Sequence, residues 1–140
     1  IDRVGPVDQL IALSEFTLEI AAWVRQTLNI PGHGLEQVAV YRDKARMKEV
    51  LQEHGLAVPP FIRCNDVKQA LEFADVVGYP VIVKPVDGAA SIGVAKVEDA
   101  QALRVILSEV DLGRYEVEAF IQGQTYHIDG FTDDSAGVPF

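Results

Sequence analysis

The chain has 140 residues, of which 49% are hydrophobic and 24% charged, a composition typical of one globular domain rather than a disordered segment. Its formal net charge of −9 and the lack of a basic stripe argue against a nucleic-acid-binding protein. No apolar run is long enough to cross a membrane, and the single cysteine, Cys64, excludes an intrachain disulfide and fits a cytoplasmic protein.

The first part of the chain predicts one strand followed by one helix. We expect a buried strand over residues 7–13 and a helix over residues 15–28, with Ser14 as its N-cap. The sequence Pro31-Gly32-His33-Gly34 is a strong loop signal. Residues 1–40 are therefore expected to be the end of an α/β domain that precedes the rest of the chain.

After this loop, helices alternate with short strands. The helix over residues 66–77, with Asn65 as a possible cap, has apolar side chains at helical spacing and so buries one face. Hairpin-linked strands between helices predict an α+β fold with a largely antiparallel sheet and flanking helices. The other expected elements are helices over 42–54 and 98–110 and strands over 61–63, 81–86, 94–97, 115–121 and 125–131.

The most specific stretch is the strand and loop Val81-Ile-Val-Lys-Pro-Val-Asp-Gly-Ala-Ala-Ser-Ile-Gly-Val94. Lys84 lies in a strand that is otherwise apolar on both faces, where a lysine is costly to bury unless it meets an anion or a carboxylate. The small residues Gly88, Ser91 and Gly93 let backbone N–H groups approach an anion, and the serine hydroxyl adds a donor. This pattern favours phosphate binding, and the alternative is a strand lysine that reaches solvent beside an ordinary turn.

Four segments, in this order, resemble the ATP-grasp superfamily, and the resemblance covers residues 41 to 131. It implies the N-terminal portion of an ATP-grasp domain: a phosphate-binding lobe over residues 41–117, then a hinge and the incomplete start of a second lobe over residues 118–140. The segments are Arg42-Asp-Lys-Ala-Arg-Met-Lys48, Gly55-Leu-Ala-Val-Pro59, Gly78-Tyr-Pro-Val-Ile-Val-Lys-Pro85 with Ser91-Ile-Gly-Val94, and Val117-Glu-Ala-Phe-Ile121 with Gly123.

The resemblance implies that Lys44 and Lys84 are the two phosphate-side lysines of an ATP site. The loop over residues 87–93 is similar to the flap that closes over the phosphates, with Ser91 and nearby amides as donors. At the start of a helix, a lysine such as Lys44 opposes the helix dipole, so a nearby anion would account for it. We interpret Arg46 and Lys48 as solvated surface residues.

Glu118, Phe120 and Ile121 resemble the hinge segment that holds adenine, with the Glu118 carboxylate accepting from the adenine amino group. Glu116 is the alternative acid, but the Glu-x-Phe-Ile-x-Gly spacing favours Glu118. Many members of the family have Gly-x-Glu after the hinge, with the glutamate on the ribose, whereas this chain has Thr125 there. The ribose contact is therefore not assigned.

The segment Tyr126-His-Ile-Asp-Gly130, which contains His127 and Asp129, resembles a segment found in some amino-acid-ligase-like branches of the family. On a strand they would share one face, where they could meet substrate or a metal, or form the solvated side of a sheet. The family's metal-holding carboxylates come from beyond the hinge, so we expect no metal ligands in this chain.

The resemblance implies an enzyme that uses ATP and Mg²⁺ to activate a small carboxylate as an acyl phosphate, which an amine then attacks. Such catalysis is mostly positioning and charge neutralisation. We expect these 140 residues alone not to turn over. Two alternatives remain: a non-catalytic nucleotide-binding module on a degenerate grasp, and a purely structural domain in which both lysines are incidental.

Overall fold

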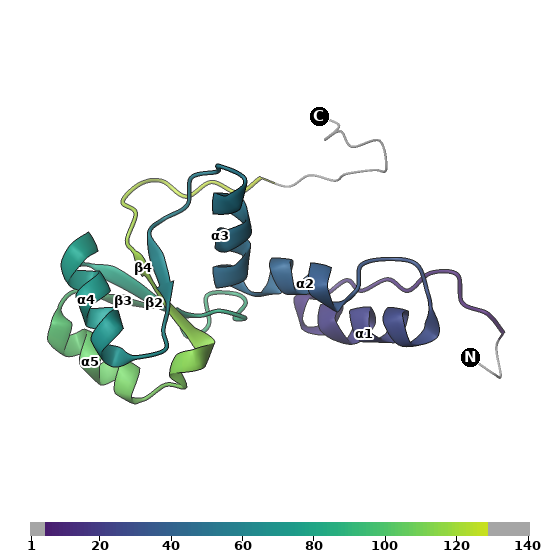
Figure 1. Cartoon of the computed structure of the whole chain (residues 1–140), viewed down its shortest axis with the longest axis horizontal. Coiled ribbons are helices and arrows are strands. Elements are labelled where there is room, and N and C mark those ends of the chain that lie inside the picture. Colours follow the sequence, from purple (N-terminus) through teal and green to yellow (C-terminus); the bar gives the residue numbers. More distant parts are fainter. Residues whose placement is uncertain (1–4, 129–140) are drawn as a thin grey trace.

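The computed structural model of the chain describes residues 5–128. The helices α1 and α2 lie side by side as an arm, and the sheet lies in the other part of the molecule with α3 between the two (Figure 1). None of the helices in the described residues is long and apolar enough to cross a membrane. The elements are η1 (Glu15–Thr17), α1 (Leu18–Leu28), α2 (Leu35–Arg42), α3 (Lys44–Glu53), β1 (Phe61–Arg63), α4 (Val67–Val77), β2 (Val81–Pro85), β3 (Ala95–Val97), α5 (Ala100–Ser108), η2 (Leu112–Arg114) and β4 (Tyr115–Ala119).

Within the described residues the strands form one four-stranded antiparallel sheet in the order β1-β4-β2-β3. Alternate side chains of a strand point to opposite faces, so the sheet has two chemically different sides. One side presents fully buried valines, among them Val83 and Val117, to α4 and α5. The other side carries Lys84, Glu116 and Glu118. The predicted α+β fold with an antiparallel sheet is confirmed.

Aspartates begin three of the helices. The side chain of Asp43 accepts from the Arg46 backbone N–H at 2.9 Å at the start of α3, and Asp99 accepts from Ala102 at 2.8 Å at the start of α5. Such caps satisfy donors that the first turn of a helix leaves free. At α4 the cap is Asp66 rather than Asn65, so that prediction was wrong by one residue.

The strand predicted over residues 7–13 is wrong. These residues run as an irregular segment beside α1, and the Leu10 carbonyl accepts from the Arg25 guanidinium, with Nη2 at 2.7 Å and Nε at 3.2 Å. A strand needs a neighbouring strand for its backbone hydrogen bonds. The side chain of Arg25 takes that role at Leu10, and an apolar run in the sequence cannot show this.

Two other elements differ from the sequence-based expectation. The helix expected from residue 42 is interrupted at Asp43, whose extended backbone (φ −88°, ψ 107°) separates α3 from α2, a helix that the sequence pattern missed. The strand expected over residues 125–131 is wrong for its described part, because residues 125–128 are irregular. Residues 129–131 lie outside the described residues.

Candidate functional site

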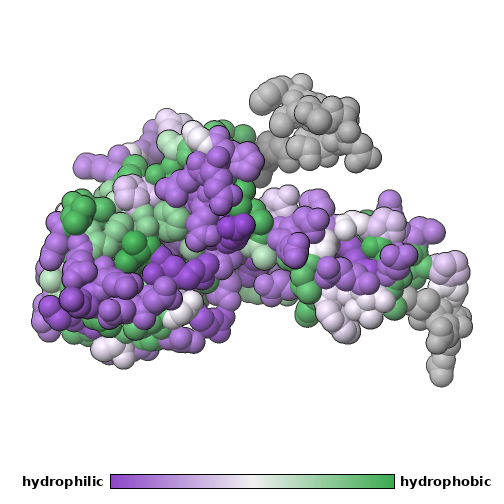
Figure 2. Space-filling view, in the orientation of Figure 1, coloured by the Kyte–Doolittle hydropathy of each residue, from purple (hydrophilic) through white to green (hydrophobic). Residues whose placement is uncertain are grey.

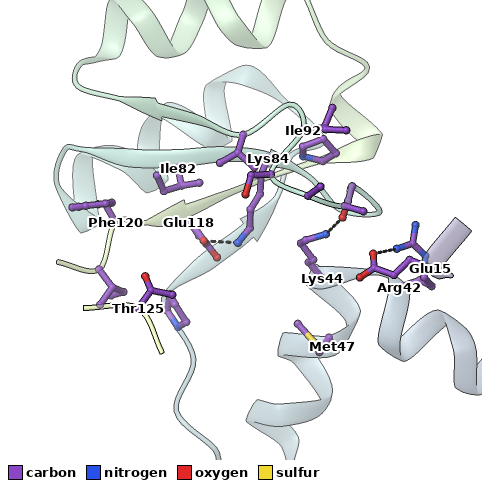
Figure 3. Close-up of a pocket in the computed structure, with 18 of the residues that line it drawn as sticks. Glu15, Arg42, Lys44, Met47, Ile82, Lys84, Ile92, Glu118, Phe120 and Thr125 are labelled. Atoms are coloured by element: carbon purple, nitrogen blue, oxygen red, sulfur yellow. Dashed lines mark hydrogen bonds and ion pairs between the residues drawn. The ribbon is translucent and has the colours of Figure 1, made fainter. Parts of the chain in front are cut away.

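A cleft of about 760 Å³ lies between the charged face of the sheet, the start of α3 and the loop after β2 (Figure 3). Elements from distant parts of the sequence contribute to it. On the face of the molecule drawn in Figure 2 the surface is mainly hydrophilic, with apolar patches over the part that holds the sheet. The lining includes most of the residues singled out in the sequence: Lys44, Lys84, Gly88, Ser91, Glu118, Phe120, Ile121 and Thr125.

One end of the cleft brings together two lysines and the small-residue loop. The ammonium of Lys44, in the first turn of α3, donates to the Gly88 carbonyl, and the Lys44 backbone N–H donates to Val86 at 2.8 Å. Burial, and then the positive charges of Lys84 and Arg42, lower the pKa of Lys44. A cation whose charged form is disfavoured in this way gains from a bound anion.

The backbone of the loop needs small residues. Ala90, Ser91 and Gly93 all have positive φ, at 52°, 59° and 74°. A Cβ on Gly93 would lie 2.9 Å from Cγ of Pro85, so both conformation and space favour glycine there. Gly93 does not line the cleft, and its part in the loop is to shape the turn that presents Gly88 and Ser91.

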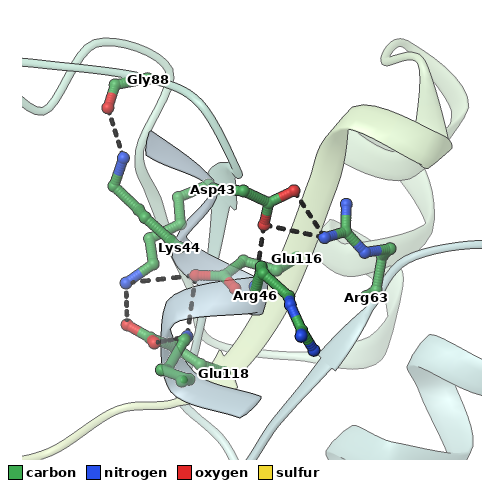
Figure 4. Close-up of polar contacts among 9 residues, drawn as sticks. Asp43, Lys44, Arg46, Arg63, Gly88, Glu116 and Glu118 are labelled. Carbon is green, nitrogen blue, oxygen red and sulfur yellow. Dashed lines mark hydrogen bonds and ion pairs between the residues drawn. The ribbon is translucent and has the colours of Figure 1, made fainter. Parts of the chain in front are cut away.

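Two lysines and two glutamates are in mutual contact at the charged face of the sheet, which Lys48 reaches from α3. Figure 3 shows the contact of Lys84 with Glu118, and Figure 4 shows Glu116 and Glu118. Lys84 Nζ lies 2.5 Å from Glu118 Oε1 and 3.5 Å from Glu116 Oε1. Lys48 Nζ lies 2.8 Å from Glu116 Oε1 and 2.6 Å from Glu118 Oε2. We call Lys48, Lys84, Glu116 and Glu118 the charge cluster.

The interpretation of Lys48 as a solvated surface residue is wrong. Only 4% of Lys48 is exposed, and its ammonium also lies 4.4 Å from the centroid of the Phe61 ring. Lys48 lies one helical turn after Lys44, so both face the sheet. The sequence signal for this was the shared helical face, but the acidic partners lie 68 and 70 residues further along the chain. Arg46, on another side of the helix, is exposed as expected.

Both acids weighed in the sequence belong to the charge cluster, but only one reaches the cleft. Glu116 is fully buried and does not line the cleft, whereas Glu118 does. Burial acts to raise the pKa of Glu118, but hydrogen bonds from Lys48 and Lys84, together with their charges, lower it below its ordinary value. Glu118 is therefore an ionised acceptor at neutral pH.

The other end of the cleft is largely apolar. Phe120 and Ile121 follow directly after β4 and line the cleft with Ile82, Met47 and Val94. The Phe120 ring has the Lys96 ammonium 4.7 Å from its centroid. A flat apolar slot beside an acceptor such as Glu118 suits an aromatic base that carries an amino group.

Arg42 is a lining residue that the sequence did not single out. Its guanidinium joins Glu15 Oε2 at 2.9 Å to the Asp87 carbonyl at 2.7 Å, so it connects η1 to the base of the loop. Asp87 is also paired with Arg114 at 2.7 Å. Glu15, Arg42, Asp87 and Arg114 are far apart in the sequence, so no local sequence pattern predicts these contacts.

Only His127 of the predicted substrate-side pair lies within the described residues. His127 is exposed and outside the lining, and Asp129 lies outside the described residues. Among residues 5–128, no group of three or more histidine, cysteine, aspartate or glutamate side chains is placed to hold a metal ion.

Residues 41–139 match the family model of the ATP-grasp domain. The chain belongs to the ATP-grasp family. The match spans α3, the sheet and the loop after β2, which together form the cleft. Both the charged end and the apolar end of the cleft therefore lie in the ATP-grasp portion of the chain.

Three proteins that are similar to this ATP-grasp chain are a synthase and two ligases. It is 31% identical over 114 residues to the carbamoyl phosphate synthase large chain of Thermotoga neapolitana, a match covering 80% of this chain and 10% of that protein. It is 34% identical over 109 residues to the D-alanine–D-alanine ligase of Pseudomonas putida, covering 74% and 34%. The crystal structure of an L-amino acid ligase from Bacillus licheniformis superposes with a TM-score of 0.67 at 29% identity, covering 84% and 27%. The chain thus spans about a third or less of these proteins.

Proposed function

We propose that this chain supplies the ATP-gripping lobe of an ATP-dependent ligase that joins a carboxylate to an amine. The observation that carries the proposal is the polarity of the cleft. Lys44 and a small-residue loop lie at one end, apolar side chains lie at the other, and the ion pair of Lys84 with the ionised Glu118 lies between them (Figure 3). ATP has the matching polarity, with a polyanion at one end and an amino-bearing aromatic base at the other.

At the phosphate end, Lys44 and Lys84 would neutralise charge on the transferring phosphoryl group. The loop holding Gly88 and Ser91 would add hydrogen-bond donors, and Gly93 would keep its shape. Lysine suits this task because it is a compact charge on a flexible stem that follows a moving phosphate. Lys84 would leave Glu118 to reach the nucleotide.

At the base end, Glu118 would accept from the adenine amino group while Phe120, Ile121 and Ile82 pack against the ring. Thr125 lines the cleft at the position that resembles the ribose site. We assign residues 41–117 to the phosphate-binding lobe, residues 118–140 to the hinge and the start of the second lobe, and residues 1–40 to the preceding domain.

ATP-grasp enzymes use ATP and Mg²⁺. The family resemblance puts the Mg²⁺ ligands beyond the hinge, and we propose that they come from elsewhere in the protein. In the proposed reaction a carboxylate oxygen attacks the γ-phosphorus and ADP leaves. The amine then attacks the acyl carbon of the acyl phosphate and inorganic phosphate leaves. This chain's residues contribute position and charge to the first step. Its likeness to two amino-acid ligases supports an amino acid as one substrate.

Thr125 favours a second candidate, a nucleotide-binding module without catalysis on the same scaffold. A threonine has one neutral hydroxyl oxygen, which holds two ribose hydroxyls less strongly than the two oxygens of an ionised carboxylate do. Ligation assays with a panel of amino acids and ATP separate the two, because ADP release that depends on both substrates would exclude the module.

Calorimetric titration with ATP and Mg²⁺, on the chain in its full natural length, tests the proposal. We expect Lys84→Met to weaken ATP binding by roughly 10- to 100-fold, because a hydrogen bond to a charged group contributes about 1.5–3 kcal/mol. The control is Lys68→Met, since Lys68 has an 81% exposed side chain on α4, away from the cleft. Unchanged ATP affinity in the folded Lys84→Met variant would count against the nucleotide site.

A further inference from the structure

The buried half of the charge cluster has no task in the function proposed so far. Lys48 and Glu116 do not line the cleft, yet both are charged residues withdrawn from solvent. Burying an ammonium or a carboxylate is costly unless it is paired. A pair of ions placed behind a binding cleft therefore calls for a reason beyond packing.

The two oxygens of Glu118 have different partners. Oε2 receives the ammonium of Lys48 at 2.6 Å, and Oε1 receives that of Lys84 at 2.5 Å. The side chain of Lys84 is 19% exposed and lines the cleft, whereas that of Lys48 is 5% exposed and does not. Lys84 can therefore exchange Glu118 for a phosphate, and Lys48 cannot.

Glu116 fixes the position of Lys48. Its Oε1 accepts from Lys48 at 2.8 Å, and its Oε2 has no hydrogen-bond partner within residues 5–128. The ring of Phe61 closes another side of the ammonium. When Lys84 leaves, Lys48 is the cation of the cluster that still holds both carboxylates.

We propose that Lys48 is a positioning residue of the nucleotide site, holding Glu118 by Oε2 so that Oε1 accepts from a purine 6-amino group once Lys84 has moved to phosphate. This inference rests on the proposed function. An ionised carboxylate held in place is an acceptor only. It pairs with a 6-amino group and repels the oxygen of a 6-oxo purine, so Lys48 acts on base selection through Glu118.

The groups that face Glu118 come from three elements. They are Lys48 on α3, Lys84 on β2 and Glu116 on the same strand β4. Phe61, opposite Glu118 on β1, carries no charge, and Arg63 of that strand is paired with Asp43 at 2.6 Å. Of the two lysines that touch Glu118, only Lys48 is outside the cleft, so it is the one to substitute.

The test compares dissociation constants for ATP, for inosine triphosphate and for inorganic triphosphate. Lys48→Met alone leaves Glu116 and Glu118 with Lys84 as the one lysine of the cluster, and this variant is prone to unfold. The principal variant is therefore Lys48→Met combined with Glu116→Met. Replacing both members of a buried pair by apolar residues is often neutral for stability. Lys48→Gln, which keeps a donor and loses the charge, is the second variant. Lys48→Arg is the conservative replacement.

We expect the natural chain to bind ATP at least about tenfold more tightly than inosine triphosphate, the ratio that one correct hydrogen bond supplies. In the double variant and in Lys48→Gln this ratio falls toward one, while affinity for inorganic triphosphate stays within about threefold. Lys48→Arg recovers most of the ratio. A purely structural role would weaken all three ligands together.

An unchanged ratio in either folded variant would overturn the role of Lys48 and leave the proposed function standing. If the natural chain binds neither ATP nor inorganic triphosphate, the proposed function fails, and the inference fails with it. If it binds both triphosphates equally well, nucleotide binding stands and base selection through Glu118 is refuted.

Discussion

Removing Lys48 alone should be among the most destabilising single substitutions in this chain. Lys48 Nζ lies 2.8 Å from Glu116 and 2.6 Å from Glu118. With an effective dielectric constant of about 20, charges 2.8 Å apart attract by roughly 6 kcal/mol, and desolvation of the buried ions offsets several kcal/mol of this. Breaking a buried pair by deleting one partner costs about 3–5 kcal/mol, because the other charge stays buried.

We therefore expect Lys48→Met to lower the free energy of unfolding by about 3–5 kcal/mol at pH 7. Urea unfolding of the chain in its full natural length measures the change. Lys48→Met with Glu116→Met should recover most of the loss, since it leaves Glu118 paired with Lys84. Lys68→Met is the surface control, expected to change stability by less than about 0.5 kcal/mol.

The loss should also depend on pH. The pKa of Glu118 is lowered in the folded state, so its interactions contribute stability at a pH above the ordinary pKa of a glutamate. That contribution is lost as pH falls through the lowered pKa. The difference in the free energy of unfolding between the natural chain and Lys48→Met should therefore become smaller at acidic pH. A loss under about 1 kcal/mol at pH 7, or a gap that widens in acid, would refute this account of the charge cluster.

Two further substitutions probe the phosphate end of the cleft. Lys44→Met should weaken ATP binding by roughly 10- to 100-fold in calorimetry. It should not lower the melting temperature, because burial and the charges of Lys84 and Arg42 already disfavour the charged form of Lys44. A large loss of stability would show a structural role instead. Gly93→Ala should lower the free energy of unfolding by about 1–3 kcal/mol. The φ of 74° at Gly93 disfavours a side chain, and a Cβ there would lie too close to the Pro85 ring. Unchanged urea unfolding would mean that the loop relaxes to accept the Cβ.

Local sequence patterns were enough for several features of the fold. Apolar spacing located α4, whose Ala70, Leu71 and Ala74 are buried as the helical period requires. Glycines ended helices, as at Gly78 with its φ of 83°. Patterns failed where the outcome depended on a partner elsewhere, as in residues 7–13, where no strand forms and the Leu10 carbonyl accepts from Arg25.

The cleft shows the same division. The lysine in an apolar strand and its small-residue loop were recognisable because each is a local chemical anomaly. Lys48 was misjudged, because helical periodicity tells which residues share a face but not what that face meets.

By itself, the sequence determined most of the local elements after residue 42 and the antiparallel α+β class, and it marked the residues that we propose for phosphate binding. The tertiary structure alone decided which charged side chains are buried and which groups they pair with. The register of β4 beside β1 and β2 puts Glu116 and Glu118 under α3, where Lys48 meets them. Electrostatic energy depends on distance and on exclusion from water, and both arise only when segments about seventy residues apart pack together.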